Sequence, residues 1–548
     1  MNIIVNEIQG QTINQLSYYE TATMVFIGPF KSKKEDSCFN CFIHKLQENE
    51  SDWYYKVKFN SLSVVWLNTL QEEIRRIDPL SLENTILVID KNNFKIKRYK
   101  IYKNVYCECN IENITSIEEG VFLESHKERV KSVDEIYNII HKNYSTLIDE
   151  NIGVGKKMFR DAESNIIPLY AIESKIKDKT YYSYGRSISL KESKISAILE
   201  MLERYSSMIP RFEKRYYNSY SALKANRYSI IEPQDYMLGN KFDSEKNIYW
   251  IELKKINSNT KYLIPEQCIY FDSQLVSNED RFIYETSNGT ALGGDFTEAL
   301  VYSILELIER DAFLVHWYLE KLPKKISVQS IHDHNILNLL KILEDFNYEI
   351  YIFDISLDID IPVVWVLARN KDKDAALYIY NAAGSNYYPD KAIFSALVEV
   401  ATSIFVYEEK LKTEKENNTF LIESPDQVKT MEDHVNYYSF KENSKAFDYL
   451  LNNIENLREI SLNDLKPKYT FSFFNILEHV NKLHPNIYYK EMNNKLIQDM
   501  NLSVVRSFIP SLQPMTFGKQ NERINFKRLQ QFCKKQNIKI RKEPHPFP

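Results

Sequence analysis

Two acidic stripes, each on a predicted helix and each followed by an arginine, constrain this chain more than any other feature. In the segment 193–207, Glu200 and Glu203 share one helical face with serines, while aliphatic residues occupy another face. The same E-x-x-E-R pattern returns at 306–310. A single pair of this kind usually lies on a solvated face. The repetition, the arginines and a Gly/Ser turn before each copy instead favour two inward-facing pairs that hold metal ions between them.

Carboxylates on two helices favour a hard cation such as Mg²⁺. The metal ligands that we predict are Glu200, Glu203, Glu306 and Glu309. Because carboxylates fill only part of the coordination shell, water and substrate phosphates should supply the rest, which indicates a nucleotide. The sequence has no P-loop and no G-x-G-x-x-G after a predicted strand. We therefore expect Arg204 and Arg310, together with Arg186, to balance phosphate charge, the first two as catalytic residues.

Four of the six cysteines form two close pairs. Cys38 and Cys41 lie in C-F-N-C, and Cys107 and Cys109 lie in C-E-C. In a chain whose first residues do not resemble a secretion signal, such pairs favour a zinc site over disulfides. We expect a closed, structural Zn²⁺ site with these four ligands, and unligated buried cysteines are the alternative.

The length of 548 residues predicts more than one domain. Mixed strand-like runs and long helical patterns predict an α/β (α+β) fold. We expect a small zinc-bearing α/β domain at 1–115, a linker at 116–150 and the main domain at 151–548. A net charge of −5 without a basic stripe argues against nucleic acid as a partner. The apolar runs are too short to span a membrane, so the sequence predicts a soluble, cytoplasmic protein.

The segments that carry the glutamates resemble the YcaO family. The resemblance runs over residues 151–548 and includes G-R-S-I-S-L-K-E-S, S-A-I-L-E-M-L-E-R, S-N-G-T-A-L-G-G-D-F-T-E-A, L-E-L-I-E-R-D, S-A-L-V-E and S-V-V-R-S-F-I-P-S-L-Q-P. It implies a YcaO-type fold that binds ATP and Mg²⁺ through the paired glutamates. The nucleotide-binding residues to which it leads are Arg186, Ser193, Ser196, Asn288, Glu298, Ser395 and Glu399. Gly294 and Thr402 depart from the family pattern, so some polar contacts near the nucleotide should differ.

The final residues, P-H-P-F-P, match the P-x-P-x-P ending of the azoline-forming branch of this family. Without that resemblance, the segment would be a stiff extended tail or a disordered end. The resemblance implies that the carboxylate of Pro548 reaches the active site and takes part in catalysis. The implied reaction is ATP-dependent cyclodehydration of a ribosomally made precursor peptide. ATP phosphorylates a backbone amide oxygen, and Cys residues, with Ser and Thr left open, become thiazolines or oxazolines.

Two other functions stay open. One is a YcaO enzyme that forms thioamides or amidines, which the P-x-P-x-P ending disfavours. The other is a non-catalytic scaffold that binds peptide for another enzyme. The glutamate pairs disfavour a scaffold, because converging carboxylates without a metal repel one another and cost stability.

The N-terminal segments F-I-G-P-F, C-F-N-C-F-I-H-K-L and C-E-C resemble part of the zinc-bearing E1-like proteins that accompany such cyclodehydratases. The region is too short for a complete E1-like protein. We therefore expect a separate E1-like (ThiF-like) partner that recognises the leader of the precursor peptide, as in thiopeptide-like pathways. An azoline dehydrogenase in the same pathway and a homodimer are further expected partners.

Overall fold

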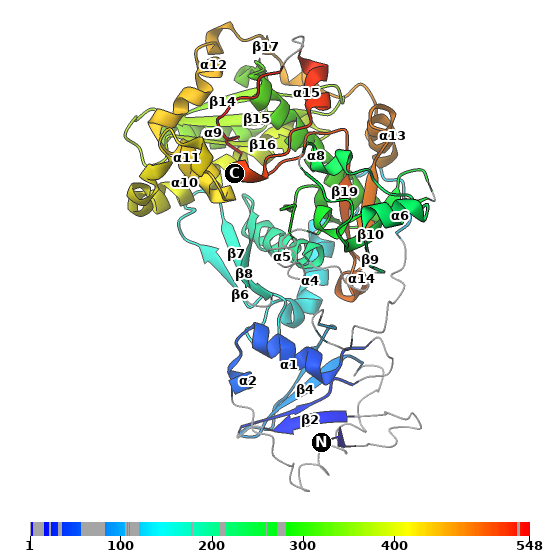
Figure 1. Cartoon of the computed structure of the whole chain (residues 1–548). Helices are drawn as coiled ribbons and strands as arrows, with labels where there is room; N and C mark the ends of the chain where they lie inside the picture. Colours follow the sequence, from blue (N-terminus) through cyan, green and yellow to red (C-terminus); the bar gives the residue numbers. More distant parts are fainter. Residues whose placement is uncertain are drawn as a thin grey trace.

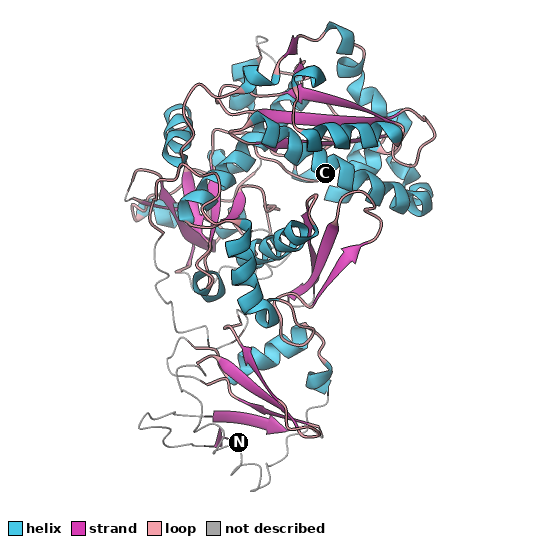
Figure 2. Ribbon diagram, turned by 180° about the vertical axis from the view of Figure 1, so that it is seen from behind, coloured by secondary structure: helices cyan, strands magenta, loops and turns pink. Residues whose placement is uncertain are grey.

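The computed structural model describes residues 2–3, 16–20, 23–30, 36–55, 83–104, 107, 109, 120–176, 179–208, 214–239, 241–258, 260–270, 281–533 and 538–547. These residues form four sheets with helices packed on them (Figure 1, Figure 2). The expected mixed α/β (α+β) class is confirmed. Over the described residues, no helix has both the length and the apolar character that crossing a membrane requires.

The N-terminal sheet is antiparallel, and a helix packs beside it at the bottom of Figure 1. Its strands, in order, are β1 (Asn2–Ile3), β2 (Leu16–Glu20), β3 (Met24–Ile27), β4 (Thr85–Asp90) and β5 (Ile96–Lys100). The helices of this unit are α1 (Phe39–Glu48) and α2 (Asp52–Tyr55). Phe26, Phe42 and Val88 share a small core that is separate from the larger ones.

The next sheet has three strands and carries the first acidic helix. Its strands are β6 (Lys157–Asp161), β7 (Leu169–Ile176) and β8 (Lys179–Arg186), and helix α5 (Leu190–Ser207) packs on β7 and β8. Ser189 caps α5 by accepting a hydrogen bond from the N–H of Glu192, so the helix begins earlier than the acidic pattern suggests. Helix α4 (Val133–Leu147), in the stretch expected to be a linker, packs on α5.

Of the other two sheets, the first lies at the right of Figure 1 and the second at the top, and each carries a long helix. The first has the order β11 (Lys261–Pro265), β10 (Ile248–Lys255), β18 (Tyr488–Glu491), β19 (Ser503–Phe508) and β12 (Thr290–Gly293), with β9 (Tyr216–Asn218) also on β10. Helix α8 (Phe296–Leu319) packs on β12 and β19. The second has the order β16 (Ile379–Ser385), β15 (Val363–Asn370), β14 (Tyr348–Asp354), β13 (Lys324–Ile326) and β17 (Glu459–Ile460). Helices α10 (Pro389–Glu414) and α9 (His334–Asp345) cover it.

Shorter helices connect these units. They are α6 (Tyr220–Ala225), α7 (Gln234–Met237), α11 (Met431–Tyr438), α12 (Asp448–Leu451), α13 (Phe473–Leu483), α14 (Lys495–Asp499) and α15 (Phe526–Phe532). Of these, α11 and α15 lie near the path of the C-terminal segment (Figure 1).

One strand–glycine–helix unit occurs in each of the three larger parts: β8 leads into α5, β12 into α8 and β16 into α10. Gly185, Gly293 and Gly384 lie at the ends of the three strands. A Cβ atom on Gly185 would lie 2.0 Å from the carbonyl oxygen of Ser193, and one on Gly384 would lie 2.3 Å from that of Ala392. Glycine is therefore required because each helix turns back directly onto the strand that precedes it.

Candidate active site

The three strand–glycine–helix units contact one another in a ring. Helix α5 contacts β12, α8 contacts β16, and α10 contacts β8. Each helix thus packs on its own strand and on the strand of the next unit. This arrangement brings the acidic residues of three helices, which are far apart in the sequence, to one place.

Backbone N–H groups hold two of the predicted metal ligands. Glu203 Oε2 accepts a hydrogen bond from the N–H of Leu292 at 3.2 Å, and Glu306 Oε2 accepts one from the N–H of Gly289 at 2.8 Å. Both donors belong to β12 or the turn before it. The S-N-G-T-A-L-G segment therefore positions one glutamate from each predicted pair.

The predicted arginines each pair with a predicted carboxylate. Arg204 Nε lies 2.9 Å from Glu200 Oε1. Arg310 lies 3.3 Å from Glu306 and 3.1 Å from Glu309. On the third helix, Glu399 lies 3.2 Å from Arg186 Nη2. These side chains are half-buried, so charged groups of both signs line one partly open site.

The carboxyl groups of Glu203 and Glu309 are raised to a pKa of about 8. Burial is the largest cause for both. Repulsion from Glu306 adds to the pKa of each, and Glu399 also raises that of Glu309, while Arg204 and Arg310 act in the opposite direction. The carboxylate of Glu306 acts on both Glu203 and Glu309, and Glu399 of the third helix acts on Glu309. The two predicted pairs and the third helix therefore share one electrostatic site.

This donor set fits Mg²⁺. The candidate ligands are all carboxylate oxygens, and a cation would relieve the repulsion that raises two of their pKa values. Within the described part of the chain, only the cysteines bring three or more ligand atoms within 4.8 Å of one another. No three of the predicted glutamate ligands come that close together, so bound Mg²⁺ would take its remaining ligands from water and from phosphate.

Some predicted nucleotide-site residues are engaged elsewhere. Ser193 is buried, and its hydroxyl contacts the carbonyl oxygens of Pro168, Ser187 and Ser189, which fixes the turn into α5. Glu298 accepts hydrogen bonds from Arg129 Nη1 at 2.9 Å and from the N–H of Val130 at 2.8 Å. These bonds tie α8 to the segment before α4.

Two predicted serines, Ser196 and Ser395, are exposed on α5 and α10. Asn288 is half-buried and lines a pocket together with Arg310. Its Nδ2 is buried without a hydrogen-bond partner in the described structure. Thr402, at a position where the family often has Gln, is buried and donates to the carbonyl oxygen of Val398 in its own helix.

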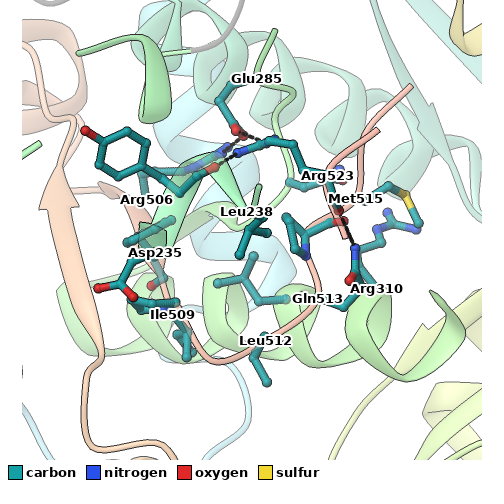
Figure 3. Close-up of a pocket in the computed structure, with 17 residues that line it drawn as sticks. Asp235, Leu238, Glu285, Arg310, Arg506, Ile509, Leu512, Gln513, Met515 and Arg523 are labelled. Atoms are coloured by element: carbon teal, nitrogen blue, oxygen red, sulfur yellow. Dashed lines mark hydrogen bonds and ion pairs between the residues drawn. The ribbon is translucent and has the colours of Figure 1, made fainter. Parts of the chain in front are cut away.

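The pocket beside Arg310 has a volume of about 50 Å³ (Figure 3). Arg506 and Arg523 both pair with Glu285 in its wall, the first at 3.0 Å. Burial lowers the pKa of the Arg506 guanidinium, although Glu285 acts to raise it. The sequence motif that resembles the family contains Arg506, but no role for this residue is predicted from it. The available signal was a charged residue within the strand-like run S-V-V-R-S-F, which the structure buries.

The C-terminal segment reaches the same region. Residues 544–547 are buried, and the ring of Phe547 packs against Phe313 with 4.9 Å between centroids. The guanidinium of Arg310 lies 4.0 Å from the centre of the Phe547 ring. Pro548, to which we assign a catalytic carboxylate, lies outside the described residues.

The four predicted zinc ligands form a cluster in the N-terminal unit. Sulfur–sulfur distances are 3.8 Å for Cys38–Cys41, 3.4 Å for Cys38–Cys107 and 3.5 Å for Cys41–Cys109. Tetrahedral zinc with Zn–S bonds of about 2.3 Å places its sulfurs roughly 3.8 Å apart. The cluster therefore has the ligand type, number and spacing that a structural Zn²⁺ requires. It joins α1 to the segment that follows β5.

Residues 184–513, more than half of the chain, match the family model described as YcaO cyclodehydratase, ATP- and Mg²⁺-binding. The chain belongs to the YcaO family. The matched region contains β12 and all three acidic helices, so it holds every predicted magnesium ligand.

A curated relative is an uncharacterized protein of Methanothermobacter thermautotrophicus, with 24% identity over 242 residues. The aligned part is 43% of this chain and 61% of the relative, so the chain spans less than two thirds of that protein. A solved heterocyclase in complex with substrate and cofactor is 18% identical with a TM-score of 0.67, covering 92% of this chain and 73% of the other. The heterocyclase TruD is 16% identical with a TM-score of 0.59, covering 94% and 71%.

The structure of a YcaO protein from Methanopyrus kandleri bound with AMPPCP and Mg²⁺ is 15% identical, with a TM-score of 0.53. The similarity covers 70% of the present YcaO chain and 92% of the Methanopyrus kandleri chain. At such low identity these likenesses establish the fold. The two heterocyclase structures extend it over the N-terminal unit as well as the family region.

Proposed function

We propose that this YcaO protein is an ATP-dependent cyclodehydratase that converts Cys residues of a ribosomally made peptide to thiazolines, with Ser and Thr as further candidate residues. The observation that carries the proposal is the shared electrostatic site, in which burial, and then repulsion from Glu306, raise the pKa of both Glu203 and Glu309. A half-buried group of carboxylates with raised pKa values is typical of a functional site. Family membership supplies the reaction class.

The reaction needs an amide oxygen to leave, and an amide oxygen is a poor leaving group. The substrate thiol attacks the carbonyl carbon of the preceding amide, forming a C–S bond and an oxyanion as the thiol proton passes to a base. The oxyanion takes the terminal phosphoryl group of ATP, which releases ADP. Loss of inorganic phosphate and of the amide proton then forms the C=N bond of the azoline ring. Mg²⁺ held by the glutamates would neutralise phosphate charge during this transfer.

Within this scheme, Arg204 and Arg310 keep the glutamates oriented and offer positive charge to the transferring phosphoryl group. We assign the same role toward the nucleotide to Arg186, and its ion pair with Glu399 supports this assignment. We assign the role of general base to the carboxylate of Pro548. The supporting observation is that Phe547, one residue before it, packs on Arg310.

We further propose that residues 1–115 form a partial E1-like domain with structural zinc, that 116–150 connects it, and that 151–548 is the catalytic domain. The cysteine cluster supports the first assignment. A separate leader-recognition protein of the E1-like type, an azoline dehydrogenase and a second copy of this chain complete the proposed partners.

Mass spectrometry of a candidate precursor peptide with this protein, the partner, ATP and Mg²⁺ tests the reaction. Each ring formed lowers the peptide mass by one water, whereas a thioamide-forming enzyme would exchange oxygen for sulfur. ADP should form in parallel with the rings. A peptide of unchanged mass, with the nucleotide consumed or not, would contradict the proposal.

A further inference from the structure

The last described residues follow α8, and residues 544–547 are buried. We call the residues of α8, α11 and β16 that contact this segment the groove. Arg541 stacks on Trp317, with its guanidinium 3.8 Å from the ring centre, and Phe547 packs between Phe313 and Arg310. These three α8 residues are three or four positions apart, so they share one face of the helix. The segment 541–547 therefore follows that face from its C-terminal part toward Glu306 and Glu309.

Three successive carbonyl groups of this segment each accept a hydrogen bond from a buried side chain. Tyr438 Oη donates to the carbonyl oxygen of Pro544 at 2.6 Å, His434 Nδ1 to that of His545 at 2.6 Å, and Asn381 Nδ2 to that of Pro546 at 2.7 Å. Each of the three donor residues is at most 2% exposed. The donors His434 and Tyr438 belong to α11, and Asn381 belongs to β16.

Other contacts fix the direction of two donors. His434 Nε2 accepts a hydrogen bond from the N–H of Gly518 at 3.1 Å, so the proton of the neutral ring must lie on Nδ1. Asn381 Oδ1 accepts one from Trp365 Nε1 at 3.0 Å, which turns Nδ2 toward the segment. The ring of His545 stacks on His434, and its Nε2 bonds to the carbonyl oxygen of Thr516.

The groove matches a proline-rich backbone in particular. Pro544 and Pro546 have no N–H group, so at these positions the extended chain offers carbonyl acceptors only. The side chains that face these carbonyls are donors. A slip of one residue would bring a proline ring to the place of His545 or Phe547 and remove their contacts.

We propose that this groove is a peptide-recognition site for a proline-rich extended segment, and that Tyr438, His434 and Asn381 are positioning residues that set the register of that segment. By setting it, they hold Phe547 on Arg310. Only the expected effect on catalysis rests on the proposed function, because Pro548, which follows Phe547, carries the carboxylate that we assign as general base. Recognition itself is independent of catalysis.

The full chain offers a matched set of variants. Tyr438→Phe removes one donor without changing the shape of the side chain, and Asn381→Asp removes another while keeping the acceptor for Trp365. Tyr449→Phe is the control, because Tyr449 also lies near Arg541 but its buried hydroxyl has no partner in the described structure. His434→Asn keeps an N–H donor and should act as the conservative rescue of His434→Ala.

Hydrogen–deuterium exchange of residues 541–547 and steady-state kinetics then report on register. Tyr438→Phe and Asn381→Asp should speed exchange of this segment by about tenfold and lower kcat by a similar factor, with the KM for ATP unchanged. Tyr449→Phe should leave both unaltered. Equal behaviour of Tyr438→Phe and Tyr449→Phe would overturn the proposal, and so would a loss of activity that appears in KM for ATP alone.

A binding experiment separates the groove from the catalytic proposal. A chain without residues 541–548, shown to be folded by circular dichroism, is titrated with the synthetic peptide R-K-E-P-H-P-F-P by calorimetry. Saturable binding that weakens about tenfold in Tyr438→Phe, and with R-K-E-A-H-A-F-A, supports the groove. Binding without recovery of cyclodehydration would count against the assigned base alone. Absence of binding, or equal binding of both peptides, would overturn the groove. If the shortened chain does not fold, the exchange experiment on the full chain decides.

Discussion

Glu203 and Glu309 carry the strongest charge conflict in the candidate site. Each side chain is half-buried, and the negative charge of Glu306 repels each carboxylate. Arg204 and Arg310 offset this conflict only in part, since both pKa values remain near 8. A metal-free chain therefore keeps carboxyl groups where a hydrocarbon or amide of similar size would cost less free energy. Such a cost is expected where carboxylates serve a ligand.

Glu309→Gln should abolish ATP turnover and leave the fold intact. The substitution removes a proposed metal ligand, so the kcat for ADP formation should fall by at least about a hundredfold. Because it also removes like-charge repulsion, the free energy of unfolding without metal should stay the same or rise by about 1 kcal/mol. Thermal unfolding and nucleotide turnover, measured together, check both expectations.

Glu344→Gln, on the exposed side of α9, is the matched control and should change neither quantity. Normal ATP turnover by Glu309→Gln would remove this residue from the metal site. A large loss of stability would show that its carboxylate has a structural role.

At the scale of the element, glycine and its neighbours determine how the acidic helices approach the site. In β8–α5 and β16–α10, the backbone of the helix comes so close to the strand that only Gly185 and Gly384 fit. The periodicity of the helices and the positions of these glycines are local signals, so the sequence predicts both. Which strand each helix contacts next is set by the packing of units that are far apart in the sequence.

The contact between α11 and the C-terminal segment should depend on pH. Burial lowers the pKa of His434 to about 4 from its ordinary 6.5. Three charged or titratable groups lie near this imidazole. His545 is also buried, and its own pKa is lowered by that burial and further by Arg310. Asp433 acts to raise the pKa of His434. Above pH 6.5 the imidazole of His434 is neutral whether the segment is docked or not. As pH falls from 6.5 toward 4, only the undocked form takes up the proton, so docking weakens.

Hydrogen–deuterium exchange of 541–547, corrected for the intrinsic pH dependence of exchange, should therefore show up to about tenfold less protection for each pH unit below 6.5. His434→Asn keeps a donor but does not titrate, so its pH dependence should be shallower and should reflect His545. Protection with the same pH profile in both proteins would contradict the assignment to His434.

At the scale of the whole molecule, the cysteine cluster and the glutamate site lie in different units. The cluster belongs to the N-terminal sheet, whose small core is separate from the cores around α5, α8 and α10. A small domain of this kind gains much of its stability from metal. The zinc site should therefore stabilise the N-terminal unit without taking part in nucleotide chemistry.

Cys38→Ser and Cys107→Ser should each remove the bound zinc, because loss of one thiolate opens the tetrahedral site. Each should lower the unfolding temperature of the N-terminal unit and leave Mg-ATP binding by the rest of the chain within about twofold. Metal analysis and calorimetry are the measurements, and Cys533→Ser, an isolated cysteine, is the control. Zinc retained in either of the first two variants would indicate different ligands.

The amino-acid sequence alone determined the acidic helices, the glycines before them and the two cysteine pairs. Each is set by local spacing, which fixes the face of a helix or the reach of a turn. Tertiary structure decided which of these groups meet. Ser193 contacts carbonyl oxygens of its own turn, Glu298 binds Arg129, and Arg506 lines the pocket beside Arg310. It also placed Asn381, His434 and Tyr438 along residues 544–546, far away in the sequence. No local pattern encodes such contacts, because they depend on how two sheets that are far apart in the sequence pack on α8.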